Sequence, residues 1–156
     1  MEGDSVFALA FLIGFVAGLR SLTAPAAVSW AAHLGWLDLE GSPLSFMGST
    51  LAVIGFSVAA VAEFAADLHP ATPSRTTTGP LLARIVLGGL SGAALTAASG
   101  QSLLAGALLG GTGGLIGAFV GYHARTRLTA ALGKAKLIAV MEDLIAIVLA
   151  VAIVSR

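Results

Sequence analysis

Apolar residues gather in long runs separated by short polar segments. Four runs cover residues 47–68, 80–98, 103–124 and 137–155. Each approaches the ~20 residues that cross ~30 Å of hydrocarbon as a helix. None alternates with the period of two that a membrane β-barrel strand needs, and a helix satisfies its own backbone hydrogen bonds in lipid. The pattern predicts an all-α integral membrane protein, with residues 1–156 as a single transmembrane helical domain.

The first apolar segment, residues 5–37, is too long for one crossing and short for two. Its middle reads Arg20-Ser21-Leu22-Thr23-Ala24-Pro25. Threonine can cap a helix and proline suits the first turn of the next one, so we expect the helix to break near Arg20–Pro25. A hairpin of two short helices, which we favour, gives six crossings, whereas one broken helix gives five. The expected fold is therefore a compact bundle of five to six transmembrane helices with glycine-rich packing.

The composition supports lipid as the solvent. The chain is 57% hydrophobic and 10% charged, with a mean hydropathy of +0.97, whereas soluble domains average about 25% charged residues. The net charge of zero provides no basic footprint for nucleic acid. With no cysteine, disulfides, thiolate metal sites and thiol nucleophiles are excluded. The start of the chain is acidic rather than basic, so we expect the first apolar segment to be retained and not cleaved as a signal peptide.

Lysine and arginine near the helix ends indicate the orientation. They occur in the loops expected at 69–79 and 125–136, the second of which contains Arg125, Arg127, Lys134 and Lys136. Two crossings separate these loops, which therefore share one side; the 125–136 segment could instead form a short interfacial helix. That side is expected to be cytoplasmic. The loops 38–46 and 99–102 then face outward, and the hairpin arrangement also places both termini outside.

Ionisable residues lie on the same helix stripes as small residues. Small residues at positions i and i+4 let membrane helices approach closely, so a charge on such a stripe is expected to point into the bundle. The stripes are Gly55-Ala59-Glu63-Asp67, Arg84-Gly88-Gly92, Gly113-Gly117-Gly121-Arg125 and Glu142-Ala146-Ala150.

These charges balance and fall towards the cytoplasmic side. Intramembrane ionisable groups are costly and are functional by default, and arginine can pair with carboxylates in bidentate geometry. An ionic lock that holds the helices in register is the alternative. Four carboxylates (Glu63, Asp67, Glu142, Asp143) match four arginines (Arg20, Arg75, Arg84, Arg125).

Further side chains could join this cluster in binding a ligand. Tyr122 and His123 precede Arg125 and could donate hydrogen bonds to an anion. The proline-rich loop at 69–79 could hold an anion with its hydroxyls and Arg75, or could serve only as a rigid turn. No cofactor is predicted, although a cation at the four carboxylates is possible. The candidate binding residues are Arg20, Glu63, Asp67, Arg75, Arg84, Tyr122, His123, Arg125, Glu142 and Asp143.

Several segments together resemble an uncharacterised family of small bacterial inner-membrane proteins, known only as a domain of unknown function. The resemblance implies a multi-pass protein of the bacterial inner membrane and supplies no activity. The matching segments are Gly18-Leu19-Arg20-Ser21-Leu22-Thr23-Ala24-Pro25, Glu63 with Ala66-Asp67, Thr72-Pro73-Ser74-Arg75-Thr76, Ala83-Arg84-Ile85-Val86, Gly121-Tyr122-His123-Ala124-Arg125 and Glu142-Asp143.

Three functions are compatible with these features. A transporter or channel for a small ion or solute is favoured, because a broken helix beside charged groups is typical of transporter sites; at this size a pore would need a homo-oligomer. The alternative is a structural or assembly protein whose ionic cluster locks helices together. A third is a membrane enzyme that acts on a phosphorylated lipid headgroup, but no catalytic signature supports it and we name no catalytic residue.

Overall fold

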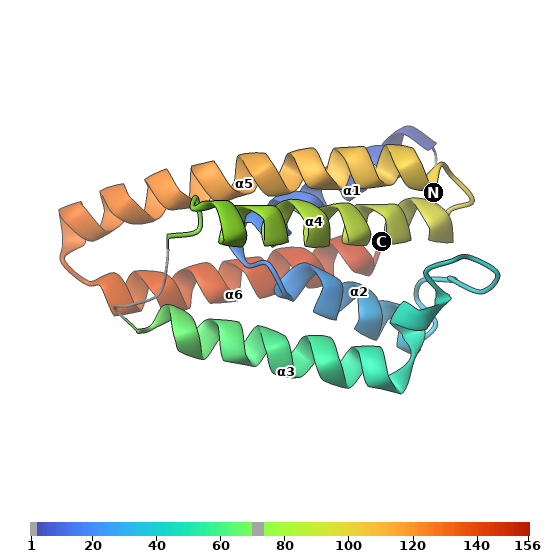
Figure 1. The fold of residues 1–156 in the computed structure, drawn as a ribbon, viewed down its shortest axis with the longest axis horizontal. Coiled ribbons are helices and arrows are strands. Elements are labelled where there is room, and N and C mark those ends of the chain that lie inside the picture. Colours follow the sequence, from blue (N-terminus) through green and yellow to red (C-terminus); the bar gives the residue numbers. More distant parts are fainter. Residues whose placement is uncertain (1–2, 70–73) are drawn as a thin grey trace.

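The computed structural model describes residues 3–69 and 74–156, and their fold is all-α. Within these residues six α-helices run alternately in opposite directions, so both ends of the chain lie at the same end of the bundle (Figure 1). The helices are α1 (Gly3–Leu19), α2 (Thr23–His33), α3 (Thr50–Asp67), α4 (Thr78–Ala98), α5 (Leu103–Leu132) and α6 (Ala135–Val154), with a short 3₁₀ turn, η1 (Ser45–Gly48), before α3.

Four of these helices, α3 to α6, are long and apolar enough to cross a membrane. They coincide with the four expected apolar runs. The first two helices are shorter: α1 has 17 residues and α2 has 11. At 1.5 Å per residue they extend only about 25 Å and about 16 Å. The first apolar segment therefore folds as a shallow hairpin beside four full-length helices.

The expected break near Arg20–Pro25 is confirmed, since α1 ends at Leu19 and α2 begins at Thr23. The chain reverses direction there (Figure 1), as in the hairpin arrangement. Pro25 lies in the first turn of α2, as expected. The role expected for Thr23 was wrong: Leu22 is the N-cap residue, and its own side chain makes no capping hydrogen bond.

Glycines bring α1, α4 and α5 into direct backbone contact. A β-carbon on Gly14 would lie 2.6 Å from the Cα of Gly110, and one on Gly110 would lie 2.9 Å from the carbonyl carbon of Gly88. Real β-carbons essentially never approach so closely, so each of these positions requires glycine. On α5, glycines facing α4 alternate with glycines such as Gly113 and Gly117 that face α1. This three-helix core has no room for side chains, as small-residue packing in membranes predicts.

The small-residue stripe expected on α3 is wrong at Gly55. Around a β-carbon placed there, no described atom lies within 4 Å. Instead α3 buries Val53 and Ala60 and packs mainly against α2, where the Trp30 indole donates a hydrogen bond to Ser57 Oγ (3.0 Å). Because α3 lies at the edge of the bundle, a single neighbouring helix decides its buried face.

The expected loop at 125–136, which we also considered as a short interfacial helix, is mostly continuous helix. α5 extends through Leu132, and Gly133 ends it in the left-handed conformation (φ +64°). α6 begins at Ala135. Residues 122–132 contain no helix breaker, so α5 continues past its apolar part and projects with the start of α6 beyond the α1–α2 turn (Figure 1).

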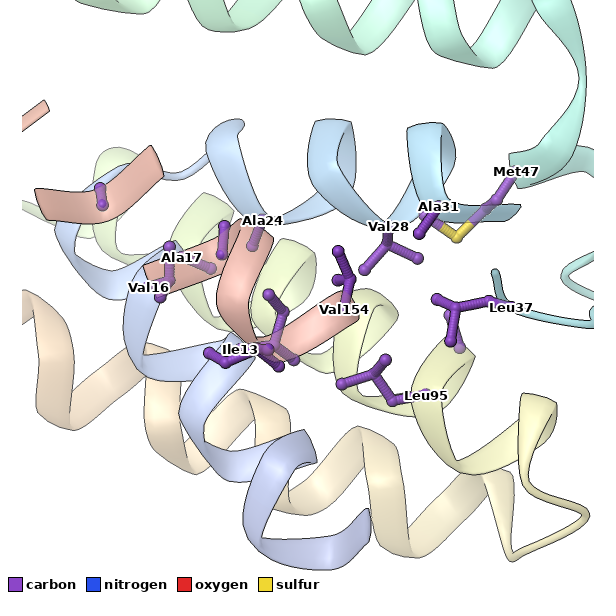
Figure 2. Close-up of a cluster of buried hydrophobic side chains, with 14 of the residues drawn as sticks. Ile13, Val16, Ala17, Ala24, Val28, Ala31, Leu37, Met47, Leu95 and Val154 are labelled. Atoms are coloured by element: carbon purple, nitrogen blue, oxygen red, sulfur yellow. The ribbon is translucent and has the colours of Figure 1, made fainter. Parts of the chain in front are cut away.

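A hydrophobic core fixes α2 within the bundle. Figure 2 shows Val28 of α2 near Val154 of α6, and Ala31 of α2 beside Met47; Ile13 of α1 belongs to the same cluster. Leu95 of α4 joins the same cluster, and Leu37 and Met47 cover it from the connection between α2 and α3. This packing holds the α1–α2 hairpin at a fixed depth, so the turn at Arg20 lies against α6.

Candidate functional site

Arg20 lies at the centre of the charged cluster and is completely buried. Its Nη1 lies 2.7 Å from Asp67 Oδ2, and its Nε pairs with Asp143 Oδ1. Nη2 lies 3.8 Å from Glu142 Oε2, and the guanidinium carbon lies 5.9 Å from the centre of the Phe64 ring. A buried charge is tolerated only when it is paired, and three carboxylates from α3 and α6 surround this one.

Two further arginines, Arg75 and Arg125, pair with carboxylates of the cluster on the side nearest the α5–α6 turn. Arg75 binds Glu142 in bidentate fashion, with N–O distances of 2.5 and 2.9 Å. Arg125 of α5 pairs with Asp67, and its Nη1 lies 3.7 Å from Glu142 Oε2. The carboxylates of Asp67 and Glu142 are thus each shared by arginines from different parts of the chain.

Glu63 satisfies the start of α2. Its Oε1 accepts hydrogen bonds from the backbone N–H (2.9 Å) and the hydroxyl (2.6 Å) of Ser21, and its Oε2 accepts one from the Leu22 N–H (3.0 Å). The first N–H groups of a helix have no partner within the helix, and the helix dipole favours an anion at this end. Glu63, which lies on α3, therefore supplies the hydrogen-bond acceptor at the start of α2 that the sequence analysis expected from Thr23.

Arginines satisfy the other side of the same turn. Arg84 donates from Nε to the carbonyl of Gly18 (3.1 Å), and Arg75 donates to the carbonyl of Leu19 (3.3 Å). Arg84 Nη2 also lies 3.5 Å from Glu63 Oε1. The last carbonyls of α1 would otherwise be orphaned. Part of the charged cluster therefore stabilises the broken helix itself.

The cluster lies well inside the ends of the longest helices. Arg20 Nη2 donates to the carbonyl of Ala139, in the second turn of α6 (3.5 Å). Gly121 of α5 packs beside Arg75, and from there α5 continues to Leu132, roughly 16 Å further at 1.5 Å per residue. Arg20 is thus in a hairpin turn, at a depth where α5 and α6 still surround it.

A cavity of about 910 Å³ lies next to the cluster, on the side of the α5–α6 turn. It is enclosed by the C-terminal ends of α3 and α5 and the start of α6. Its charged lining is Asp67, Arg75, Arg125 and Lys136, so basic groups outnumber acidic ones. His69 and four hydroxyl groups complete the polar wall. The hydroxyl groups come from Ser74, Tyr122, Thr126 and Thr129. The cavity is suited to an anionic group, because arginine and hydroxyl donors can bind one together.

The structure brings together all eight charged candidate residues in ion pairs. Tyr122 lines the cavity, whereas His123 packs edge-to-face on the Tyr122 ring (centroids 5.4 Å apart) and is exposed. In the described part of the chain, no three His, Cys, Asp or Glu residues are grouped as metal ligands. Residues 70–73 of the expected rigid loop lie outside the described residues.

Sequence reasoning missed several residues of this site. Lys136 was read only as an orientation signal, and Thr126 and Thr129 were not considered. The signal was present: Tyr122, Thr126 and Thr129 recur at helical spacing on one face of α5. Treating 125–136 as a loop concealed this pattern.

Residues 7–155 match a family profile described as a domain of unknown function, DUF4126. The chain belongs to this family. The match confirms the resemblance inferred from the sequence and covers nearly the whole chain. No curated protein and no solved structure matches this DUF4126 protein.

Proposed function

We propose that this DUF4126 protein is a multi-pass transporter or channel of the bacterial inner membrane that binds a small anionic solute in the basic cavity above Arg20. The observation that carries the proposal is the cavity's position. Basic residues outnumber acidic ones in its lining, which includes Asp67 and Arg125, and these two form an ion pair. Buried ionisable groups beside a cavity and a broken helix are the usual components of a transport site.

An anion in the cavity would compete with Asp67 for Arg125. Asp67 would keep Arg20 as a partner at 2.7 Å, so the exchange leaves no carboxylate unpaired. Arg20 itself stays held by Asp143. Binding would therefore loosen the contact between α3 and α5 without breaking the centre of the cluster, which is the kind of differential contact that couples a ligand to a conformational change.

The distribution of basic residues supports a cytoplasmic position for the cavity. Seven of the eight lysines and arginines fall at the cluster end of the bundle by sequence position, and only Arg156 falls at the other. This is the asymmetry of the positive-inside rule.

Transport through a single copy would need a path past α1, α4 and α5, whose backbones touch. The solute would therefore cross between copies in a homo-oligomer, or along the loosely packed α3. In either case the glycine core of α1, α4 and α5 stays unchanged.

The second candidate is an ionic lock in a structural or assembly protein. It is favoured by Glu63 and Arg84, whose hydrogen bonds are largely spent on the α1–α2 turn. On that proposal the cluster binds no ligand.

A thermal-shift screen of the purified protein in neutral detergent separates the two proposals. The panel holds monovalent and divalent cations, inorganic phosphate and glycerol phosphate. A ligand that binds only the folded state stabilises it by mass action, by about 2.7 kcal/mol at a hundred times its dissociation constant. We expect an anion to stabilise the wild-type protein, and Arg125→Gln to abolish the shift.

Arg127→Gln is the matched control, since Arg127 lies two residues further on α5 but does not line the cavity. Uptake of the stabilising anion into proteoliposomes then tests transport. If no ligand shifts the melting temperature while Glu63→Gln and Arg84→Gln are both strongly destabilised, the ionic lock replaces the transporter.

A further inference from the structure

A second cavity lies over α2 between α3 and α6, nearer the end of the bundle that holds both termini; we call the line between α3 and α6 the seam. It has a volume of about 310 Å³ and is walled mainly by apolar side chains from α2, α3 and α6. Trp30 and Trp36, which are both exposed, lie at the end away from the charged cluster. Tryptophan prefers the membrane–water interface. We call this cavity the apolar groove; it runs from the outer interface towards Phe64 and Thr23.

One polar atom in the wall of the apolar groove is left unsatisfied. Thr23 is 5% exposed, and within the described residues its hydroxyl oxygen has no hydrogen-bond partner. Buried hydroxyls normally have a partner, and an orphan requires an explanation. A ligand with a polar group at this depth would supply one.

The apolar groove and the basic cavity follow the same two helices. On α3, Phe64 lines the groove and Asp67, less than one turn later, lines the cavity. On α6, Ile147 lines the groove and Ala139 lines the cavity, with Asp143 of the charged cluster midway between them. Along the seam, the lining is thus basic near the α5–α6 turn and apolar towards the end that holds both termini, and Arg20 lies between the two parts.

The seam also faces lipid. α3 packs on α2 and is otherwise largely uncovered: Leu51, Val58 and Val61 are 82%, 64% and 65% exposed. On α6, Val148 and Val151 are 65% and 47% exposed. A molecule could therefore reach the groove sideways from the bilayer.

From this arrangement we propose that the ligand of the basic cavity is an anionic amphiphile, with its phosphate or carboxylate headgroup in the cavity and its hydrocarbon chain in the apolar groove. This inference rests on the proposed function and names its substrate class. Charge complementarity selects the headgroup, because Arg75, Arg125 and Lys136 line the cavity and Asp67 is the one acidic residue among its described lining, whereas Glu142, which pairs with Arg75, does not line it. The alignment of the two cavities along α3 and α6 selects a chain attached to it.

The hydroxyl of Thr23 fits the junction of such a molecule. An ester or hydroxyl oxygen between headgroup and chain would lie at the boundary of the polar and apolar parts, where Thr23 begins α2 beside the charged cluster. A free anion would leave both the groove and this hydroxyl unused.

Binding measurements on the purified protein in neutral maltoside detergent test the inference with three probes: inorganic phosphate, lysophosphatidic acid and lysophosphatidylcholine. The three separate the anionic headgroup from the chain. We expect lysophosphatidic acid to stabilise the protein at a concentration at least ten times lower than phosphate does, and lysophosphatidylcholine to give no shift.

Two variants, Ala27→Phe and Thr23→Val, locate the chain, and a third serves as a control. Ala27→Phe fills the apolar groove from a half-buried position on α2, and it should weaken lysophosphatidic acid binding at least tenfold while leaving the phosphate response unchanged. Ala8→Phe is the matched control: it fills a different surface groove, between α1 and α6, whose lining includes Arg156 but none of the basic residues of the cavity beside Arg20. Thr23→Val should weaken the lipid several-fold and leave phosphate unaffected.

The outcomes separate this inference from the proposed function. If phosphate and lysophosphatidic acid act at similar concentrations and Ala27→Phe changes neither, the ligand is a soluble anion; the amphiphile is overturned while the transport site stands. If Ala8→Phe weakens the lipid as much as Ala27→Phe does, the apolar groove is not its site and the inference also fails. If neither anion binds, both proposals fall.

Discussion

At Arg20 the cost of a buried charge is offset by partners that are distant in sequence. The guanidinium is held by Asp67 and Asp143. Removal of one partner from a buried ionic group leaves the others uncompensated, and such losses cost about 3–5 kcal/mol. The stability of this site therefore depends on the set of charges more than on any single pair.

We expect Arg20→Met to lower the free energy of unfolding by about 3–5 kcal/mol, measured by thermal or denaturant unfolding in detergent. The double variant Arg20→Met/Asp143→Leu should recover part of this loss, because it removes a carboxylate that the first change leaves unpaired. Additive losses in the double variant would show that Asp143 and Arg20 are not energetically coupled.

Glu63 combines an ion pair with a helix cap. Glu63→Gln keeps the shape but removes the charge from an acceptor of three hydrogen bonds. Hydrogen bonds to charged groups contribute about 1.5–3 kcal/mol, and we expect a loss of that order in unfolding experiments. Glu40→Gln, in the exposed connection after α2, should stay within about 0.5 kcal/mol of the wild type.

At the scale of the helices, two classes of glycine have opposite effects. At Gly110 the backbones of α4 and α5 lie too close together for a methyl group between them, whereas Gly55 on α3 faces open space. Tight contact requires glycine at the first position. The second carries only the entropic cost of a flexible residue inside a helix.

Gly110→Ala should therefore destabilise the protein by about 1–3 kcal/mol, as overpacking does. Gly55→Ala should leave the free energy of unfolding unchanged or raise it by up to about 1 kcal/mol, with a melting temperature that is unchanged or higher. Both are measured by thermal unfolding in the same detergent. A stabilising Gly110→Ala would contradict the backbone contact between α4 and α5.

At the scale of the whole molecule, the alternating helices set which connections share a side. The connections at 34–49 and 99–102 lie at one end of the bundle with both termini, and the turn between α5 and α6 lies at the other (Figure 1). Because the chain has no cysteine, single cysteines can report this directly.

We expect Ser42→Cys and Gln101→Cys to react with a membrane-impermeant maleimide in intact cells. Ala131→Cys, near the end of α5, should react only after the membrane is permeabilised. Lysines and arginines are concentrated at this end of the bundle, and they favour the cytoplasmic side. Labelling of Ala131→Cys together with Ser42→Cys would contradict the alternation of the helices. Reversal of both would leave the fold intact and invert the orientation.

Much of the fold followed from local patterns. Hydropathy located α3 to α6, and Pro25 marked the break before α2. The glycine spacing on α5 located its buried face, and the same stripe pointed Arg125 towards the cluster. These predictions succeeded because they depend on one helix and its nearest neighbours.

The predictions that failed depended on neighbours that the sequence does not specify. Gly55 lies on a stripe like the others, but α3 is at the edge of the bundle and buries a different face. Thr23 had the right chemistry for a cap, but Glu63 supplies the acceptor from α3. Helical spacing alone could not say which helix would lie opposite either residue.

The sequence by itself determined that the chain is a helical membrane protein, where its first helix breaks, and that its buried charges balance. These properties follow from hydrophobicity, backbone geometry and charge, which are local. Only the tertiary structure decided that Arg20 is paired with Asp67 and Asp143, that Glu63 caps α2, and that a basic cavity adjoins an apolar groove. Those features depend on how helices of unequal length are shifted along one another, and that shift is set by contacts between residues distant in the chain.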